Sequence, residues 1–254
     1  MFFIRILASI SNMKKVIQQV LEKLGLDRKV FYSEDDFKHS VAFGIHDKFD
    51  KKNADLDIRL EVPKNVEFQF RNGSTLEKEI YLDILLTCKE CMWPIELKYK
   101  TKKSKLSVDR EVYNLKNHSA RDVSRYNFRK DIYRIEKLKK HPIFKNGYAI
   151  ILTNDSKYWE DDTDEINMDG NYRISDKIFK NDSGWLYIDS EYFRNLYYFD
   201  KNDGLYRSKK TDKKHWTYSK ENNYDLQLSV EYKAEWKDFS LISDSLFRYL
   251  LVEI

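Results

Sequence analysis

The chain contains little glycine, proline or cysteine: its 254 residues include seven glycines, three prolines and two cysteines. So few glycines and prolines, with no repeated segment, argue against a solenoid or a linker-rich architecture. Two cysteines cannot build a disulfide framework, which favours a protein of the reducing cytoplasm. There is also no phosphate-binding loop, no dinucleotide-binding glycine motif and no Ser-His-Asp order, so the enzyme classes built on these motifs have no support.

Long hydrophobic runs are missing as well. Residues 1–12 hold a short apolar stretch that Arg5 interrupts. The stretch is too short to cross a membrane and lacks a clear cleavage site, so we expect no membrane association. Met13 would also make a plausible translation start, which leaves open whether Met1 or Met13 is the native one. Apolar side chains at helical spacing predict a helix over residues 13–24, and Gly25 is placed to end it.

What the chain does have is a globular composition with an uneven charge distribution. Hydrophobic residues make up 41% of it, aromatic residues 15%, and the net charge is +4. Between Lys98 and Lys145, sixteen Lys or Arg residues stand against five Asp or Glu residues. Such a basic segment is typical of a face that binds a polyanion. A solvated lysine-rich surface would give the same pattern, so both interpretations stay open.

Two apolar runs, residues 81–86 and 93–100, flank a short polar segment and predict two adjacent strands joined by a turn. Glu96 and Lys98 lie two residues apart and therefore share one face of the second strand. Asp83, in the first strand, can reach the same face if the strands are neighbours. Two carboxylates repel each other unless a cation lies between them, and a divalent cation fills that role best.

The spacing of Asp83, twelve further residues and then Glu96-x-Lys98 resembles the core motif of the PD-(D/E)XK nuclease superfamily, which includes restriction endonucleases and Holliday junction resolvases. The proline that usually precedes the first acid is replaced here by Leu82. A wider likeness, over roughly residues 30–160, links the chain to a little-characterised group of bacterial nuclease-like proteins. The segments that carry this wider likeness are 33–40, 95–101, 124–132 and 147–155.

The resemblance implies an α/β fold with a restriction-endonuclease-like core, in which helices flank a central mixed β-sheet. It implies a Mg²⁺-dependent endonuclease, with Mn²⁺ as a substitute, in which Asp83, Glu96 and Lys98 are catalytic. The metal ligands would be Asp83, Glu96 and the backbone carbonyl of Leu97. The metal would stabilise charge on the phosphate and activate a water, while Lys98 would orient that water or neutralise the transition state.

Glu34 is a further candidate for the catalytic and metal-binding set. Ser33 followed by Asp36 is an N-cap signal for a helix whose apolar stripe includes Phe37 and Val41, and Glu34 lies on that stripe. Members of the superfamily often add a glutamate from the first helix as a metal or second-layer ligand. The alternative is an ordinary first-turn acid that the helix dipole favours.

A basic helical pattern over residues 120–140 is followed by a fully apolar strand at 148–153, and the crossover predicts a parallel strand pair. Basic and aromatic side chains in and before this helix are expected to contact nucleic-acid phosphates without reading sequence. These are Lys100, Lys102, Lys103, Arg121, Arg125, Tyr126 and Arg129. Arg125 and Tyr126 have a second expected position, beside the metal, because this helix packs against the motif strands.

The chain is expected to divide into an N-terminal helix or extension (1–30), a nuclease core (31–160) and a β-rich C-terminal extension that packs on the core (161–254). Its partner would be nucleic acid, with DNA favoured, and a homodimer is left open; phage defence or mobile-element biology is suggested by analogy alone. One alternative is a catalytically silent module that binds nucleic acid or a protein. Another is a structural Asp, Glu and Lys cluster in an unrelated α/β protein that binds no Mg²⁺.

Overall fold

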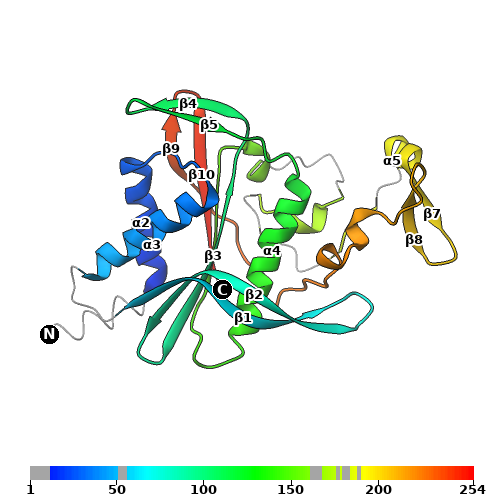
Figure 1. Cartoon of the computed structure of the whole chain (residues 1–254), viewed down its shortest axis with the longest axis horizontal. Helices are drawn as coiled ribbons and strands as arrows, with labels where there is room; N and C mark the ends of the chain where they lie inside the picture. The colour runs from blue at the N-terminus through cyan, green and yellow to red at the C-terminus, as the bar shows by residue number, and fades with distance from the viewer. Residues whose placement is uncertain (1–11, 51–55, 161–167, 176–177, 179–183, 188–189) are drawn as a thin grey trace.

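The computed structural model describes residues 12–50, 56–160, 168–175, 178, 184–187 and 190–254. This part of the chain is a mixed α/β fold around a six-stranded sheet of order β1-β2-β3-β6-β10-β9 (Figure 1). Only β3 and β6 pair in parallel, so the predicted mixed sheet is confirmed. The strands are β1 (Asp57–Gln69), β2 (Thr75–Cys88), β3 (Cys91–Lys100), β6 (Tyr148–Thr153), β9 (Trp236–Ile242) and β10 (Ser245–Glu253).

Helices cover both faces of the sheet, as expected. The described residues form four α-helices: α2 (Met13–Asp27), α3 (Glu34–Asp50), α4 (Arg121–Leu138) and α5 (Glu191–Leu196). Helices α2 and α3 lie on one face and α4 on the other (Figure 1). All of β6 is buried, with Ile150 and Leu152 in the core beneath α2 and α3, and Ala149 and Ile151 in the core beneath α4. Side chains alternate along a strand, so one apolar strand supplies both cores.

The start of α3 confirms the predicted cap. The Ser33 hydroxyl accepts a hydrogen bond from the Asp36 backbone N–H at 3.1 Å, and the Asp36 carboxylate accepts the Tyr32 N–H at 2.9 Å. The prediction that Gly25 ends the preceding helix is wrong, because α2 continues to Asp27. Gly25 is instead a contact point: an added Cβ would overlap the backbone carbonyl oxygen of Phe239 in β9.

Between β3 and β6 the chain makes the predicted crossover through α4, and the strands pair from Ile95↔Tyr148 to Lys100↔Thr153. A small hairpin of β4 (Ser104–Val108) and β5 (Glu111–Leu115), which the sequence pattern did not suggest, precedes α4. Because this hairpin follows β3 directly, it lies at the end of the sheet where Lys100 and Lys102 emerge.

The end of the expected β-rich extension forms β10, which pairs with β6. Strands β9 and β10 of the expected extension are thus part of the central sheet. A smaller unit built from α5, β7 (Tyr197–Asp200) and β8 (Leu205–Ser208) lies away from that sheet (Figure 1). Residues 1–11, which hold the N-terminal apolar stretch, are outside the described residues. Among the described helices, none has the length and apolar character needed to span a membrane.

Candidate active site

The ladder between β2 and β3 ends beside the candidate acids. It runs from Cys88↔Cys91 to Ile84↔Ile95 and then stops. At the next position, the carboxylate of Asp83 accepts the backbone N–H of Leu97 at 2.7 Å. Because a buried N–H without a partner costs free energy, this hydrogen bond fixes Asp83 where the two strands separate.

Strand β1 is irregular at the same level of the sheet. The register passes from Leu60↔Ile84 to Val62↔Leu82, and Glu61 between them has a φ of 53°. Leu60 packs against the core beneath α2 and α3, whereas Val62 packs against the core beneath α4, so the strand changes the face that it buries. The irregularity places the Glu61 carboxylate against Lys38 of α3.

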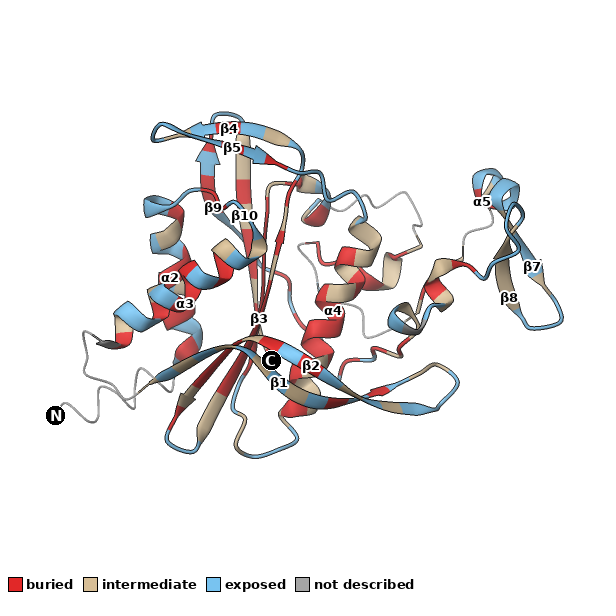
Figure 2. Ribbon diagram, viewed as in Figure 1, coloured by how far each residue is buried: buried red, intermediate tan, exposed pale blue. Residues whose placement is uncertain are grey.

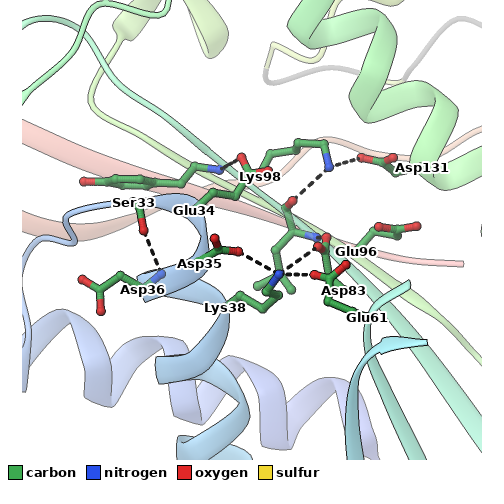
Figure 3. Close-up of polar contacts among 12 residues, drawn as sticks. Ser33, Glu34, Asp35, Asp36, Lys38, Glu61, Asp83, Glu96, Lys98 and Asp131 are labelled. Carbon is green, nitrogen blue, oxygen red and sulfur yellow. Dashed lines mark hydrogen bonds and ion pairs between the residues drawn. The ribbon is translucent and has the colours of Figure 1, made fainter. Parts of the chain in front are cut away.

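Glu96 and Lys98 do share one face of β3, as predicted, and that face is turned toward α4 (Figure 3). Only 2% of the Glu96 side chain is exposed. The Lys98 ammonium donates to the backbone carbonyl of Leu97 at 3.0 Å and lies 2.9 Å from a carboxylate oxygen of Asp131. The Leu97 carbonyl is therefore directed into the charged cluster, while the Leu97 N–H is held by Asp83.

Helix α4 contributes two groups to the cluster that were not predicted as site residues. Asp131 is almost fully buried, and the Arg134 guanidinium lies 3.0 Å from one of its carboxylate oxygens. The same guanidinium lies 3.4 Å from the Glu96 carboxylate. The signal available in the sequence was Asp131 itself, an acid next to the apolar stripe of a basic helix.

Helix α3 contributes Glu34 and Lys38 from the other side. The Glu34 carboxylate accepts hydrogen bonds from the Tyr99 backbone N–H at 2.8 Å and from the Lys100 ammonium at 2.9 Å, so Glu34 reaches the end of β3. Sequence reasoning missed Lys38, although it lies one helical turn after Glu34. Its buried ammonium is 3.8 Å from Asp83 and also pairs with Asp35 and Glu61 (Figure 3).

Burial dominates the electrostatics of the cluster. It raises the pKa of Asp83, and burial together with the neighbouring charge of Asp131 raises the pKa of Glu96 well above its usual value. Burial alone would lower the pKa of Lys98, but Asp131, Glu96 and Asp83 outweigh it and the pKa is raised. Lys98 is thus an ammonium at neutral pH, whereas the positive charges near Asp83 and Glu96 do not offset the burial of these two carboxyl groups.

The donor chemistry of this cluster fits Mg²⁺. The groups available are the carboxylates of Asp83, Glu96 and Glu34 and the carbonyl of Leu97, and all of them offer oxygen, the ligand atom that Mg²⁺ prefers. A bound divalent cation would lower the raised pKa values of the Asp83 and Glu96 carboxyl groups. Within the described ranges, no three His, Cys, Asp or Glu side chains gather as closely as metal ligands do. The Glu34, Asp83 and Glu96 carboxylates are each accompanied by a lysine or arginine instead, so a metal would compete with these cations.

The residues expected to contact nucleic acid fall into two groups. Lys102 and Lys103 are exposed and line a shallow depression of about 600 Å³ together with Lys105 and Trp159. The depression begins two residues after Lys100. It extends the positive charge away from the cluster along the end of the sheet.

The remaining expected contacts are engaged within the protein. Lys100 pairs with Glu34, Arg121 with Asp155 and Arg125 with Asp169. Tyr126 is fully buried, with its ring stacked on Trp185 at a centroid distance of 5.1 Å. Arg129 is buried and donates to the Leu226 carbonyl at 3.0 Å. The assignment of Tyr126 and Arg129 to a nucleic-acid surface is therefore corrected, because α4 turns both side chains toward the C-terminal segment that covers it.

Comparison of the chain with protein-family models, with curated proteins and with solved structures found no match in any of the three searches. The site is accordingly judged on its own geometry and chemistry. Its defining feature is a pair of desolvated carboxyl groups, Asp83 and Glu96, held beside the charged Lys98 where two strands separate.

Proposed function

We propose that the protein is a Mg²⁺-dependent nuclease with a restriction-endonuclease-like core that hydrolyses phosphodiester bonds in nucleic acid, with DNA as the favoured substrate. The observation that carries the proposal is the meeting of Asp83, Glu96 and Lys98 around the backbone of Leu97. Carboxylate oxygens, a carbonyl oxygen and an ammonium are the groups that metal-assisted phosphodiester hydrolysis needs at one place.

The order of the elements supports the same proposal. A helix, three antiparallel strands, a crossover helix and a parallel strand come in the order α3, β1, β2, β3, α4 and β6, with the β4–β5 hairpin inserted between β3 and α4. The resemblance implies a mixed sheet that carries its acids near the middle. Asp83 and Glu96 lie on the second and third of six strands, which agrees with that arrangement.

The residues of the cluster would have different roles in this reaction. Asp83, Glu96 and the Leu97 carbonyl would hold the metal, with Glu34 as a further ligand or as a support for one. Bound Mg²⁺, or Mn²⁺ in its place, would supply charge stabilisation at the phosphate and a more acidic water. Lys98 keeps its proton, so its role is to orient the water or neutralise the phosphorane-like transition state rather than to accept a proton.

Asp131 and Arg134 act as positioning residues in this scheme. Asp131 holds the Lys98 ammonium at 2.9 Å, and Arg134 bridges Asp131 to Glu96. The exposed Lys102, Lys103 and Lys105 would contact the phosphates on either side of the cleaved bond.

A second candidate is a silent module of the same architecture that binds nucleic acid or a protein partner. One observation favours it: Glu34, Asp83 and Glu96 each lie beside a cationic side chain of the protein itself. Such internal pairing would also suit the third alternative, a purely structural cluster. The structural cluster predicts no response to Mg²⁺, and the silent module predicts binding without cleavage.

The test is cleavage of labelled duplex DNA, single-stranded DNA, branched DNA and RNA in Mg²⁺, Mn²⁺ or EDTA. Wild type would be compared with Asp83→Asn and Lys98→Ala. Asp57→Asn, at an exposed aspartate of β1, is a matched control for the first change, and Lys15→Ala, at an exposed lysine of α2, is one for the second. We expect metal-dependent cutting that both site variants lose and both controls keep. Cutting that survives Asp83→Asn would refute the assignment, whereas salt-sensitive binding without any cutting would favour the silent module.

A further inference from the structure

The small unit away from the sheet has an aromatic interior of its own. We call residues 190–218 the aromatic lobe; it contains α5, β7 and β8. Phe193, Tyr197 and Tyr206 pack around His215, with centroid distances of 4.6 Å from Tyr197 to His215 and 5.1 Å from Phe193 to Tyr206. Burial lowers the pKa of His215 to about 4, so this histidine is neutral and belongs to the interior.

The outside of the aromatic lobe carries large apolar side chains that face solvent. Tyr192 is 76% exposed, Phe199 49% and Tyr198 38%. Figure 2 shows further exposed residues along α5 and β7. Aromatic rings left in water on so small a unit indicate a binding surface rather than a second core. The charges around them indicate what binds.

The charge of the aromatic lobe is positive, and three of its acids are already engaged. It holds seven basic and four acidic residues. Asp200 and Asp203 both pair with Arg207, and the Asp212 carboxylate accepts the hydroxyl of Tyr198. Four exposed lysines have no ion pair among the described residues: Lys201, Lys209, Lys210 and Lys213.

Three of these lysines are displayed by an ordered turn. The Ser208 N–H donates to the Lys213 carbonyl at 2.9 Å, the Asp212 N–H donates to the Ser208 carbonyl at 2.8 Å, and the Lys209 N–H donates to the Leu196 carbonyl at 2.9 Å. The bond from Tyr198 to Asp212 ties the same turn to an exposed ring. The turn that carries three lysines is thus joined to the strand that carries the exposed Tyr198 ring.

We propose that the aromatic lobe is a docking site for single-stranded nucleic acid, with Tyr198 as a stacking platform for a base and Lys209, Lys210 and Lys213 as phosphate contacts. Unpaired bases are the partner that fits, because only they offer π-faces together with a negatively charged backbone. A duplex would offer phosphates to the lysines but no unpaired base to stack on the Tyr198 ring. The choice of a nucleic-acid ligand rests on the proposed function, whereas binding at the lobe can be tested without any cleavage.

The probe is a fluorescent oligothymidylate of about 20 nucleotides, longer than a single binding site. Binding is followed by anisotropy in the Asp83→Asn background, so that cleavage cannot interfere, and salt is varied from about 50 to about 200 mM. The triple change of Lys209, Lys210 and Lys213 to Gln should weaken binding about tenfold or more and reduce the salt slope by about 2.

The matched control is the triple change of Lys15, Lys29 and Lys237 to Gln. It removes the same charge from exposed positions of α2, the segment after it and β9, and should leave binding within about twofold. Tyr198→Leu should weaken binding about fivefold or more, because a stacked base contributes about 1–3 kcal/mol. Tyr198→Phe keeps the ring and loses the bond to Asp212, so it should bind more tightly than Tyr198→Leu. Circular dichroism and the melting temperature confirm that each variant is folded.

Equal losses in the two lysine triples would overturn the inference, because binding would then follow net charge alone. It would also be overturned if Tyr198→Leu bound as tightly as Tyr198→Phe, or if duplex DNA competed better than oligothymidylate. A wild-type protein that binds through the lobe but cuts nothing would refute the proposed nuclease and leave the docking site standing. The two proposals therefore fail in different ways.

Discussion

Lys130 of α4 offers the most direct test of what it costs the folded protein to bury a charged group next to the site. It precedes Asp131, lies one turn before Arg134, and is almost fully buried with its ammonium 5.5 Å from the centre of the Tyr126 ring. Burial and the positive charge of Arg134 lower its pKa to about 8. We therefore expect Lys130→Met to stabilise the folded protein at neutral pH.

The size of the effect follows from the pKa. A fall from 10.5 to about 8, at roughly 1.36 kcal/mol for each pKa unit, means that charged Lys130 costs the folded state about 3 kcal/mol. The cation–π contact with Tyr126, worth roughly 0.5–2 kcal/mol, is lost as well, although the Met side chain fills the same apolar space. The net gain in unfolding free energy should be about 1–3 kcal/mol.

The lowered pKa of Lys130 determines how the stability gain of Lys130→Met depends on pH. Because the folded-state pKa of Lys130 is depressed, the penalty is complete below about pH 8, shrinks as pH rises further and disappears above the unfolded-state value of 10.5. Only about 1 kcal/mol of the penalty remains at about pH 10. The advantage of Lys130→Met over wild type should therefore be largest near pH 6.5 and fall to about 1 kcal/mol or less near pH 10.

Urea unfolding at these two pH values measures both quantities. Lys137→Met is the matched control, because the Lys137 ammonium lies 4.6 Å from the Tyr133 ring on the same helix but the side chain is partly exposed. The control should lose a few tenths of a kcal/mol at both pH values. A wild type that is more stable than Lys130→Met at pH 6.5, or a gain that is equal at both pH values, would refute the reasoning.

Three further predictions concern the site and its supporting helix. Mg²⁺ should raise the melting temperature of wild type but not of Asp83→Asn, and an equal rise in both would remove Asp83 from the metal site. Burial raises the pKa of both Asp83 and Glu96, so metal-dependent cutting should already decrease at a pH above ~4, the usual pKa of a free carboxyl group. A pH–rate profile that decreases only at about pH 4 would contradict the burial argument. Gly25→Ala should cost about 1–3 kcal/mol in urea unfolding because the new methyl meets the Phe239 carbonyl, and unchanged stability would mean that α2 can shift outward.

The part of the fold that the sequence predicted is the part in which apolar residues run for the length of a strand. Residues 81–86 and 93–100 predicted neighbouring strands, and 148–153 a buried one, because a strand places every second side chain on one face. That alternation also sufficed to bring Glu96 and Lys98 to the same face. The nuclease interpretation itself came from the resemblance and stays a prediction.

The partners of the acids could not be predicted, because periodicity reveals a face and not a neighbour. Helix α4 has charged residues along its whole length, so its pattern does not distinguish Arg129, which is buried, from the basic residues that stay in water. The burial of Tyr126 depends on Trp185 and Tyr172, which lie far along the chain. Lys38 was missed for the same reason, since its three acidic neighbours come from α3, β1 and β2.

The backbone of Glu61 bears on the choice between a functional site and a structural cluster. Five other non-glycine residues in the described chain have positive φ values, and they all lie in turns: Lys89, Asp109, Arg110, Asp212 and Ser243. Glu61 alone has one in the interior of a strand, at the level of Asp83. Such a conformation costs on the order of 1–3 kcal/mol, and a cluster that served stability alone would gain by losing it. Strain kept where the sheet opens toward Asp83 is the pattern expected when the position of that carboxylate matters more than the stability of the strand.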